Sequence, residues 1–232
     1  MTFVVAEIGI NWDGNLNLAK KMIKKAKQVG CDAVKFQAFN LDIVKEHPQS
    51  ERLLKSSISR DNIKKITSFA KEEDIEWFCT PMFVNAIEIL EPFVKRYKIR
   101  EIDGRKLLQN QTTEIFEKIL ETGKEIIVSS NSSPKNSKFY ENKNIKWLYC
   151  VPKYPTDVSD LDFSQIKDFD GFSNHSSDIL IPVISTILGS EIIEIHVTLD
   201  KHKDFIDNNV SLDFDEMKEL VRQIRIVNRI SK

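Results

Sequence analysis

Short apolar runs alternate with longer amphipathic segments from one end of this 232-residue chain to the other. The apolar runs are predicted to be strands, at residues 2–8, 33–38, 76–80, 96–100, 125–128, 145–150, 171–173 and 191–197. Segments with an apolar stripe of helical period lie between them, at residues 16–28, 59–71, 86–91, 113–120, 163–167, 179–188 and 214–229. A strand–helix unit repeated about eight times is typical of a closed parallel barrel. We therefore expect one α/β domain, a single (β/α)8 TIM barrel, over residues 1–232.

A doubly wound open sheet is the alternative that the same rhythm allows. Its dinucleotide-binding form would carry three glycines just after the first strand, but residues 8–12 contain only Gly9. The chain length also suits a single α/β barrel, which commonly has about 250 residues.

Charge and cysteine usage exclude several classes of partner. The chain has 34 basic and 35 acidic residues and a net charge of -1, so neither nucleic acid nor an anionic membrane is an expected partner. Glu7 comes too early for the apolar core of a signal peptide, and no apolar stretch approaches the roughly 20 residues that span a bilayer. Cys31, Cys79 and Cys150 show no metal-site spacing and are expected to be buried, reduced thiols, which points to the cytoplasm.

Polar residues stand at nearly all of the predicted strand ends, where barrels of this class place their active sites. His175 and His196 end two consecutive strands, which are neighbours in a barrel, and neutral imidazole is a common ligand of catalytic divalent metals. Strand alternation turns His196 toward the mouth, with Glu194 beneath it as a partner. The alternative is that both histidines are hydrogen-bonded core residues. His47 and His202 lie in loops without this context.

Two lysines, Lys35 and Lys98, end the second and fourth predicted strands. An ammonium group in a barrel mouth is unfavourable unless an anion meets it. Together with hydroxyl groups of neighbouring strand ends, the lysines could hold a phosphate and a carboxylate. These hydroxyl residues are Thr80, Ser129 and Ser173. The alternative is a structural ion pair with a carboxylate such as Glu7 or Glu101.

An ordered set of short motifs resembles the barrel domain of the sialic acid synthase family. In chain order they are AEIGIN at residues 6–11, DG at 13–14, CDAVKFQ at 31–37, YKI at 97–99, IVS at 127–129, YP at 154–155, SNH at 173–175, EIHVTLD at 194–200, and Asp207 with Ser211. Each motif alone is short, but together they keep the order of the family and span residues 3–222.

This resemblance implies a fold, a reaction and roles for particular residues. The reaction is the metal-dependent condensation of phosphoenolpyruvate with an N-acylated amino sugar aldehyde, which gives a sialic-acid-like nonulosonic acid and releases phosphate. His175 and His196 would bind the divalent ion, Mn²⁺ or Mg²⁺, which polarises the aldehyde. The residues implied to contact phosphoenolpyruvate are Lys35, Thr80, Lys98, Ser129 and Ser173, and those implied to contact the sugar are Gln37, Tyr154 and Asp207. Glu7 matches an acidic position suited to proton transfer, and Asp103 could replace a catalytic acid of the family.

Several positions depart from the family motifs. Trp12 stands where histidine is usual, and Pro152 where asparagine is usual. Glu101 places a carboxylate where the family offers a hydroxyl to phosphate, which weakens affinity unless Arg100 or Arg105 compensates.

Family members add a small C-terminal domain related to antifreeze proteins, which this chain is expected to lack. We therefore expect an open mouth and a homodimer, with a separate capping protein or the loops at residues 42–57 and 131–144 as candidate covers. The first loop has no aromatic anchor and is expected to be mobile. A second function stays open: a drifted barrel that acts as another acid-sugar lyase or aldolase, or a non-catalytic sugar-binding partner of a full synthase.

Overall fold

The computed structural model describes residues 1–231, which form a closed barrel of eight parallel strands in chain order. The strands are β1 Phe3–Gly9, β2 Ala33–Ala38, β3 Glu76–Pro81, β4 Arg96–Ile99, β5 Glu125–Ser130, β6 Ile145–Tyr149, β7 Gly171–Asn174 and β8 Ile192–His196. The predicted barrel is thus confirmed, and the open-sheet alternative is excluded. Lys232, the last residue of the predicted domain, lies outside the described residues.

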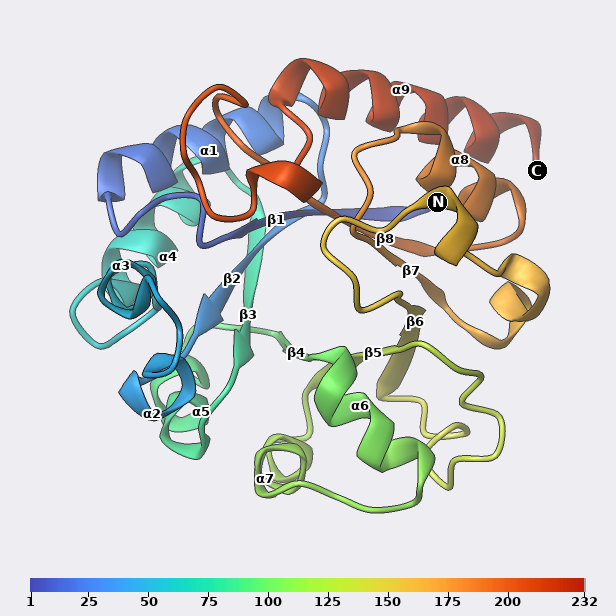
Figure 1. The fold of residues 1–232 in the computed structure, drawn as a ribbon, viewed down its shortest axis with the longest axis horizontal. Coiled ribbons are helices and arrows are strands. Elements are labelled where there is room, and N and C mark those ends of the chain that lie inside the picture. Colours follow the sequence, from blue (N-terminus) through green and yellow to red (C-terminus); the bar gives the residue numbers. More distant parts are fainter. Residues whose placement is uncertain (232) are drawn as a thin grey trace.

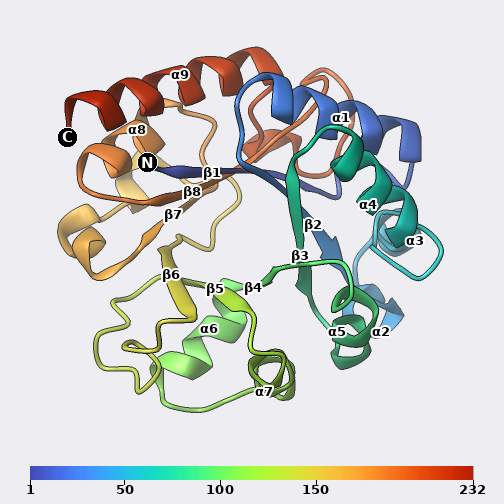
Figure 2. The same cartoon turned by 180° about the vertical axis from the view of Figure 1, so that it is seen from behind.

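Helices surround the strands as an outer ring (Figures 1 and 2). The α-helices are α1 Leu16–Gln28, α2 Leu41–Val44, α3 Ser50–Lys55, α4 Ile63–Glu72, α5 Val84–Leu90, α6 Glu101–Leu108, α7 Glu114–Glu121, α8 Leu180–Ile187 and α9 Phe214–Ile230. Short 3-10 helices are η1 Val158–Asp160, η2 Phe163–Asp168 and η3 Asn208–Val210. The predicted helix at residues 163–167 is therefore η2, and the other predicted helices appear as α1, α4, α5, α7, α8 and α9.

Barrel closure depends on the pairing of β1 with β8, whose register runs from Phe3 opposite Ile192 to Glu7 opposite His196. The last helix supports the same junction from outside, because the Asn228 side chain accepts a 3.2 Å hydrogen bond from the Thr2 backbone N–H. Both ends of the chain therefore contribute to one seam. The functional consequence is that loops from opposite ends of the sequence share one side of the mouth.

Two mouth segments differ from the sequence prediction. Residues 42–57, expected to be a mobile loop, contain parts of α2 and the whole of α3. Val44 and Leu53 anchor these helices in a small apolar cluster with Ile10 and Phe39. The segment is therefore anchored by two aliphatic side chains, although it has no aromatic anchor of its own. Helix α6 follows β4 directly, in a stretch that we expected to be a strand-end motif only.

The three cysteines are free and buried, as predicted. Burial raises the pKa of the Cys31 and Cys150 thiols to about 12, so they stay protonated at neutral pH. None of the helices within residues 1–231 combines the length and the apolar character that crossing a bilayer requires.

The β7–β8 contact gives a test of how tightly the barrel is closed. A Cβ atom on Gly171 would lie 2.0 Å from the Ile192 carbonyl oxygen, which belongs to the neighbouring strand and cannot move freely. Gly171→Ala should therefore lower the free energy of unfolding by about 3 kcal/mol, the upper range for an overpacked interior. Gly123→Ala is the control: its Cβ meets no atom within 4 Å, and at φ +67° it adds only the strain of a left-handed alanine, about 1 kcal/mol. Urea denaturation followed by circular dichroism would measure both, and equal losses would contradict the expected close contact.

Candidate active site

A cavity of about 290 Å³ opens at the C-terminal ends of the strands. All the predicted site residues except Asp103 line it: Glu7, Lys35, Gln37, Thr80, Lys98, Ser129, Tyr154, Ser173, His175, His196 and Asp207. Arg100 and Cys150, the last residues of two predicted strands, also line it, and the side chains that we did not predict there are Ile10, Met82 and Ile102. The cavity has a charged floor contributed by β1, β2, β4 and β8, and an imidazole wall contributed by β7 and β8.

Glu194 is the centre of the charged floor. Its Oε1 atom accepts hydrogen bonds of 2.9 Å from Lys98 Nζ and 2.9 Å from Ser173 Oγ, and it lies 3.6 Å from Lys35 Nζ. Burial favours the neutral acid, but the two ammonium groups outweigh it and lower the pKa of Glu194 to about 2. The carboxylate is therefore ionised at any physiological pH.

Lys35 is held by a second buried carboxylate. Its Nζ atom lies 3.0 Å from Glu7 Oε1 and 3.2 Å from Thr80 Oγ1. Gln37 donates a 2.8 Å hydrogen bond to the same Glu7 oxygen. Burial favours a neutral amine, but Glu194 and Glu7 outweigh it and raise the pKa of Lys35. The ion-pair alternative from the sequence is thus present, and the paired lysine also faces the cavity.

Four polar atoms of cavity-lining residues are buried without a hydrogen-bond partner among the described residues: Glu7 Oε2, Glu194 Oε2, Ser129 Oγ and His196 Nδ1. Buried polar atoms are normally satisfied, so a water or a ligand is expected to meet each of them. Two of these atoms accept hydrogen bonds only, whereas the Ser129 hydroxyl can also donate one to an anion.

The imidazole wall consists of His175 and His196, whose ring centroids are 5.4 Å apart. The Nδ1 atom of His175 lies 2.9 Å from the Val151 carbonyl oxygen, which can only accept, so Nδ1 carries the proton. Its Nε2 atom keeps a lone pair that accepts a 2.8 Å hydrogen bond from the Tyr154 hydroxyl. Burial, and then the neighbouring His196, lower the pKa of His175 to about 3. His175 is therefore a neutral imidazole whose Nε2 lone pair faces the Tyr154 hydroxyl at the cavity.

His196 faces a carboxylate instead of a carbonyl. Its Nδ1 atom lies 3.4 Å from Asp207 Oδ2 and has no well-aligned hydrogen bond within the described residues. Burial lowers the pKa of His196, but the contact with Asp207 and the charge of Glu7 outweigh it and raise the pKa. Gly9 makes the approach possible, because a Cβ atom there would lie only 3.3 Å from Asp207 Oδ2.

Our prediction that Glu194 partners His196 is wrong. Strand alternation correctly places both side chains inside the barrel, but Glu194 lies a layer deeper, where Lys98 reaches it across the barrel. The carboxylate beside His196 comes instead from Asp207, in the loop between β8 and α9.

The imidazoles of His175 and His196 would suit a catalytic metal better than a structural one. Within residues 1–231 no three or more His, Cys, Asp or Glu side chains converge in a way that could hold an ion. Two adjacent imidazoles could supply part of a coordination shell, and catalytic ions keep positions open for water or substrate. A bound ion would compete with the Tyr154 hydroxyl for His175 and with a proton for His196.

The fourth strand end differs most from what the sequence suggested. Asp103 does not line the cavity; its Oδ2 atom lies 2.8 Å from Arg100 Nε. Arg100 and Glu101 do line the cavity, and Arg105 Nε lies 2.6 Å from Glu101 Oε1. Of the two arginines that could compensate for Glu101, Arg105, on the next turn of α6, is the one that pairs with it. The signal for Arg100 was its place as the last residue of a predicted strand.

Of the other two departures, only Pro152 lines the cavity. Trp12 is buried beneath the mouth, where its Nε1–H donates a 3.1 Å hydrogen bond to the Ser56 carbonyl and its ring packs edge-on against Phe36. Trp12 therefore fastens the segment after α3 and has no contact with the cavity.

Comparison with known proteins agrees with this geometry. The NeuB family profile matches residues 22–232. The N,N'-diacetyllegionaminic acid synthase of Legionella pneumophila is 30% identical, and the match covers 96% of this chain and 71% of that protein. The N-acetylneuraminate-9-phosphate synthase of Mus musculus is 29% identical, and the match covers 98% of this chain and 70% of that protein. The crystal structure of N-acetylneuraminic acid synthetase from Leptospira borgpetersenii in complex with citrate has a TM-score of 0.86 and 27% identity, covering 99% of this chain and 84% of that one.

The low pKa of His175 predicts an acid-dependent loss of stability in the metal-free protein. Its folded pKa of about 3 lies below the unfolded value of about 6.5, so only the unfolded chain takes up a proton between them. Between about pH 7.5 and about pH 5 this should cost about 2 kcal/mol of unfolding free energy. His175→Gln should remove that part of the pH dependence, whereas the exposed loop variant His202→Gln should keep it. Denaturation curves in the presence of a chelator would show this, and identical slopes for the wild type and His175→Gln would contradict it.

Proposed function

Because the chain belongs to the NeuB family, we propose that it condenses phosphoenolpyruvate with an N-acylated amino sugar aldehyde, giving a sialic-acid-like acid and inorganic phosphate. The observation that carries this proposal is the division of the cavity. Both ammonium groups and two of the three hydroxyl groups of Ser and Thr lie on the side of β2 to β5, whereas both imidazoles, the phenol and three of the four carboxylates lie on the side of β6, β7, β8 and β1. One side suits an anion, and the other suits a polarised, hydroxylated substrate.

Phosphoenolpyruvate is proposed to bind on the β2 to β5 side. Lys35 and Lys98 would meet its negative groups, and the Thr80 and Ser129 hydroxyls would complete the hydrogen bonds. Ser129 supports this placement most directly, because its buried Oγ atom has no partner among the described residues. Arg100, at the rim, adds a third cation to the same side.

The charge of the cavity supports a divalent metal. Its lining contains four carboxylates against three cations: Glu7, Glu101, Glu194 and Asp207 against Lys35, Lys98 and Arg100. A substrate with a phosphate and a carboxylate would make this region still more negative, which is unfavourable in a partly dehydrated space. We propose that His175 and His196 hold Mn²⁺ or Mg²⁺, which would offset that charge. When bound, such an ion polarises the aldehyde oxygen of the sugar.

The remaining residues are proposed to orient the sugar and to move protons. The new bond forms between carbon 3 of phosphoenolpyruvate and the aldehyde carbon, and the aldehyde oxygen takes up a proton. Water then adds at carbon 2, and the bond from carbon 2 to the phosphate oxygen breaks as the keto group forms. We assign proton transfer to Glu7, and two observations support this: its Oε2 atom has no partner among residues 1–231, and its Oε1 atom is held by Lys35 and Gln37. Tyr154 and Asp207, on the imidazole side, would contact the sugar.

Phosphate release tests the reaction and the anion side together. The wild type should release phosphate from phosphoenolpyruvate when Mn²⁺ and a suitable N-acyl amino sugar are both present. Lys35→Ala should weaken phosphoenolpyruvate binding by about 2 kcal/mol, or roughly thirtyfold, because a charge-assisted hydrogen bond is lost. Lys64→Ala, on the exposed face of α4, is the matched control. If the wild type neither binds phosphoenolpyruvate nor releases phosphate with any N-acyl amino sugar tested, the proposed synthase activity is wrong. The lyase, aldolase or non-catalytic alternatives then replace it.

Metal binding is tested separately by calorimetry with Mn²⁺. The double variant His175→Ala/His196→Ala should lose Mn²⁺ binding and keep its fold, because residues at the mouth contribute more to function than to packing. His202→Ala, in an exposed loop, should bind like the wild type. Circular dichroism would confirm that both variants are folded, and unchanged Mn²⁺ affinity in the double variant would refute the assignment.

A further inference from the structure

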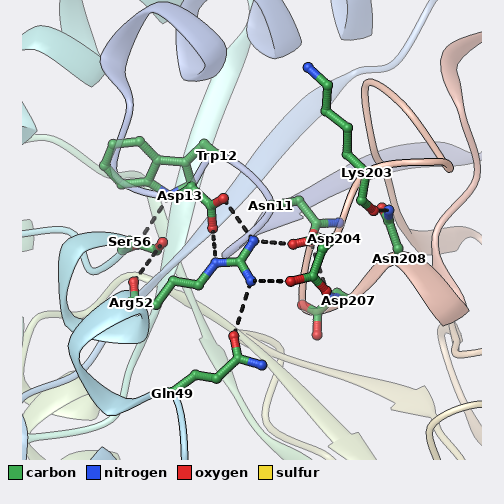
Figure 3. Close-up of polar contacts among 10 residues, drawn as sticks. All are labelled: Asn11, Trp12, Asp13, Gln49, Arg52, Ser56, Lys203, Asp204, Asp207 and Asn208. Atoms are coloured by element: carbon green, nitrogen blue, oxygen red, sulfur yellow. Dashed lines mark hydrogen bonds and ion pairs between the residues drawn. The ribbon is translucent and has the colours of Figure 1, made fainter.

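Arg52, on α3, lies outside the cavity but contacts two loops that border it (Figure 3). We propose that Arg52 is a positioning residue, which holds the loop between β8 and α9 where Asp207 reaches His196. Its importance for catalysis rests on the proposed function, but its effect on the loop does not.

The first contact of Arg52 fixes α3 to the end of β1. Its Nε and Nη2 atoms lie 2.8 Å and 2.8 Å from the two carboxylate oxygens of Asp13, a bidentate pair. The hydrogen bond from Trp12 to the Ser56 carbonyl ties the same two segments one turn further on. Helix α3 is therefore a fixed support, and the guanidinium group has a fixed orientation on it.

The second contact reaches the loop between β8 and α9. Arg52 Nη1 lies 3.2 Å from Asp204 Oδ2, and Nη2 donates to the Asp204 main-chain carbonyl oxygen. The Asp204 side chain is 94% exposed, so its charge contributes little. The main-chain contact holds the backbone itself, three residues before Asp207, whatever the side chain does.

The rest of the loop shows why this contact matters. Lys201 ties the start of the loop to Glu216 on α9. At its end, Asn11 Oδ1 accepts a 3.1 Å hydrogen bond from the Asp207 backbone N–H. The middle of the loop, which contains Asp204, lies between these two anchors. Arg52 binds this part of the loop. Without Arg52, the segment before Asp207 loses this contact, and Asp207 keeps only the backbone hydrogen bond to Asn11 and those its own carbonyl accepts from Val210 and Ser211 further along the loop.

Hydrogen exchange of single amides, followed by NMR on the unliganded full chain, tests the clamp without any substrate. In Arg52→Ala the amides of Asp207 and Asn208, which donate to Asn11 and Phe205, should exchange about tenfold faster than in the wild type. Lys203→Ala is the matched control: it removes a charge from the same loop, and Figure 3 shows this side chain pointing away from the clamp.

Two further variants separate the contacts of Arg52. Asp204→Asn keeps the main-chain carbonyl, so the Asp207 amide in this variant should exchange at the wild-type rate, because the exposed charge is not what holds the loop. Arg52→Lys keeps the charge but loses the forked geometry, so its exchange should lie between those of the wild type and Arg52→Ala. If the Asp207 amide exchanges equally fast in Arg52→Ala and Lys203→Ala, the proposal is wrong.

Mn²⁺ calorimetry then tests whether the clamp acts through Asp207. Asp207→Ala should weaken Mn²⁺ binding by about tenfold or more, the usual cost of losing a group that orients a metal-binding histidine. Arg52→Ala should weaken it less, and should add nothing in the Asp207→Ala background. Additive losses would overturn the positioning role and leave Arg52 as a structural residue. If the wild type binds no Mn²⁺, the metal part of the proposed function fails, and the exchange of the Asp207 amide alone decides on the clamp.

Discussion

The register of β1 between its two neighbours is the constraint on which the rest of the site depends. Glu7 is paired with Lys35 on β2 and with His196 on β8, so one carboxylate connects the charged floor with the imidazole wall. A slip of one residue would turn Glu7 out of the barrel. The same pairing closes the sheet and brings the loops that follow β1, β2 and β8 together. The Arg52 clamp and the contact of Asp207 with His196 both depend on that closure.

Charge pairing in the floor has two opposite effects on function. Glu194 and Glu7 raise the pKa of Lys35 and keep it charged in a buried place, where a lone lysine would tend to lose its proton, and Glu194 also pairs with Lys98. The same carboxylates compete with any anion for those ammonium groups, because the oxygen atoms of both are already 2.9 to 3.0 Å away. A substrate must therefore bring more hydrogen-bonding capacity than a carboxylate offers, or additional positive charge must come with it. This balance favours an anion with several oxygen atoms over a simple carboxylate.

The sequence predicted the barrel and nearly all of the cavity lining, because periodicity identifies strands and the fold dictates which strand ends meet. It could not predict details that depend on distance between elements. Asp103 was expected at the site, but α6 begins at Glu101 and carries it toward Arg100. Asp207 and not Glu194 lies beside His196, because alternation gives the side of a strand and not the depth in the barrel. Helices α2 and α3 were missed because four and six residues are too few for a periodic signal.

The surroundings of Gly9 are harder to change by substitution than the rim of the cavity is. The φ of +52° at Gly9 strains any other residue, and a Cβ atom would lie 3.3 Å from each of three polar side chains, Glu7, Gln37 and Asp207, which would have to shift to accept it. The groups that touch there belong to three different segments, so a change at this glycine would disturb all of them at once. Ile102, at the rim, is 58% exposed and is less constrained by its neighbours. New sugar specificities can therefore arise by substitution at the rim while the arrangement around Gly9 stays fixed, which is one way in which a single barrel could serve many acid sugars.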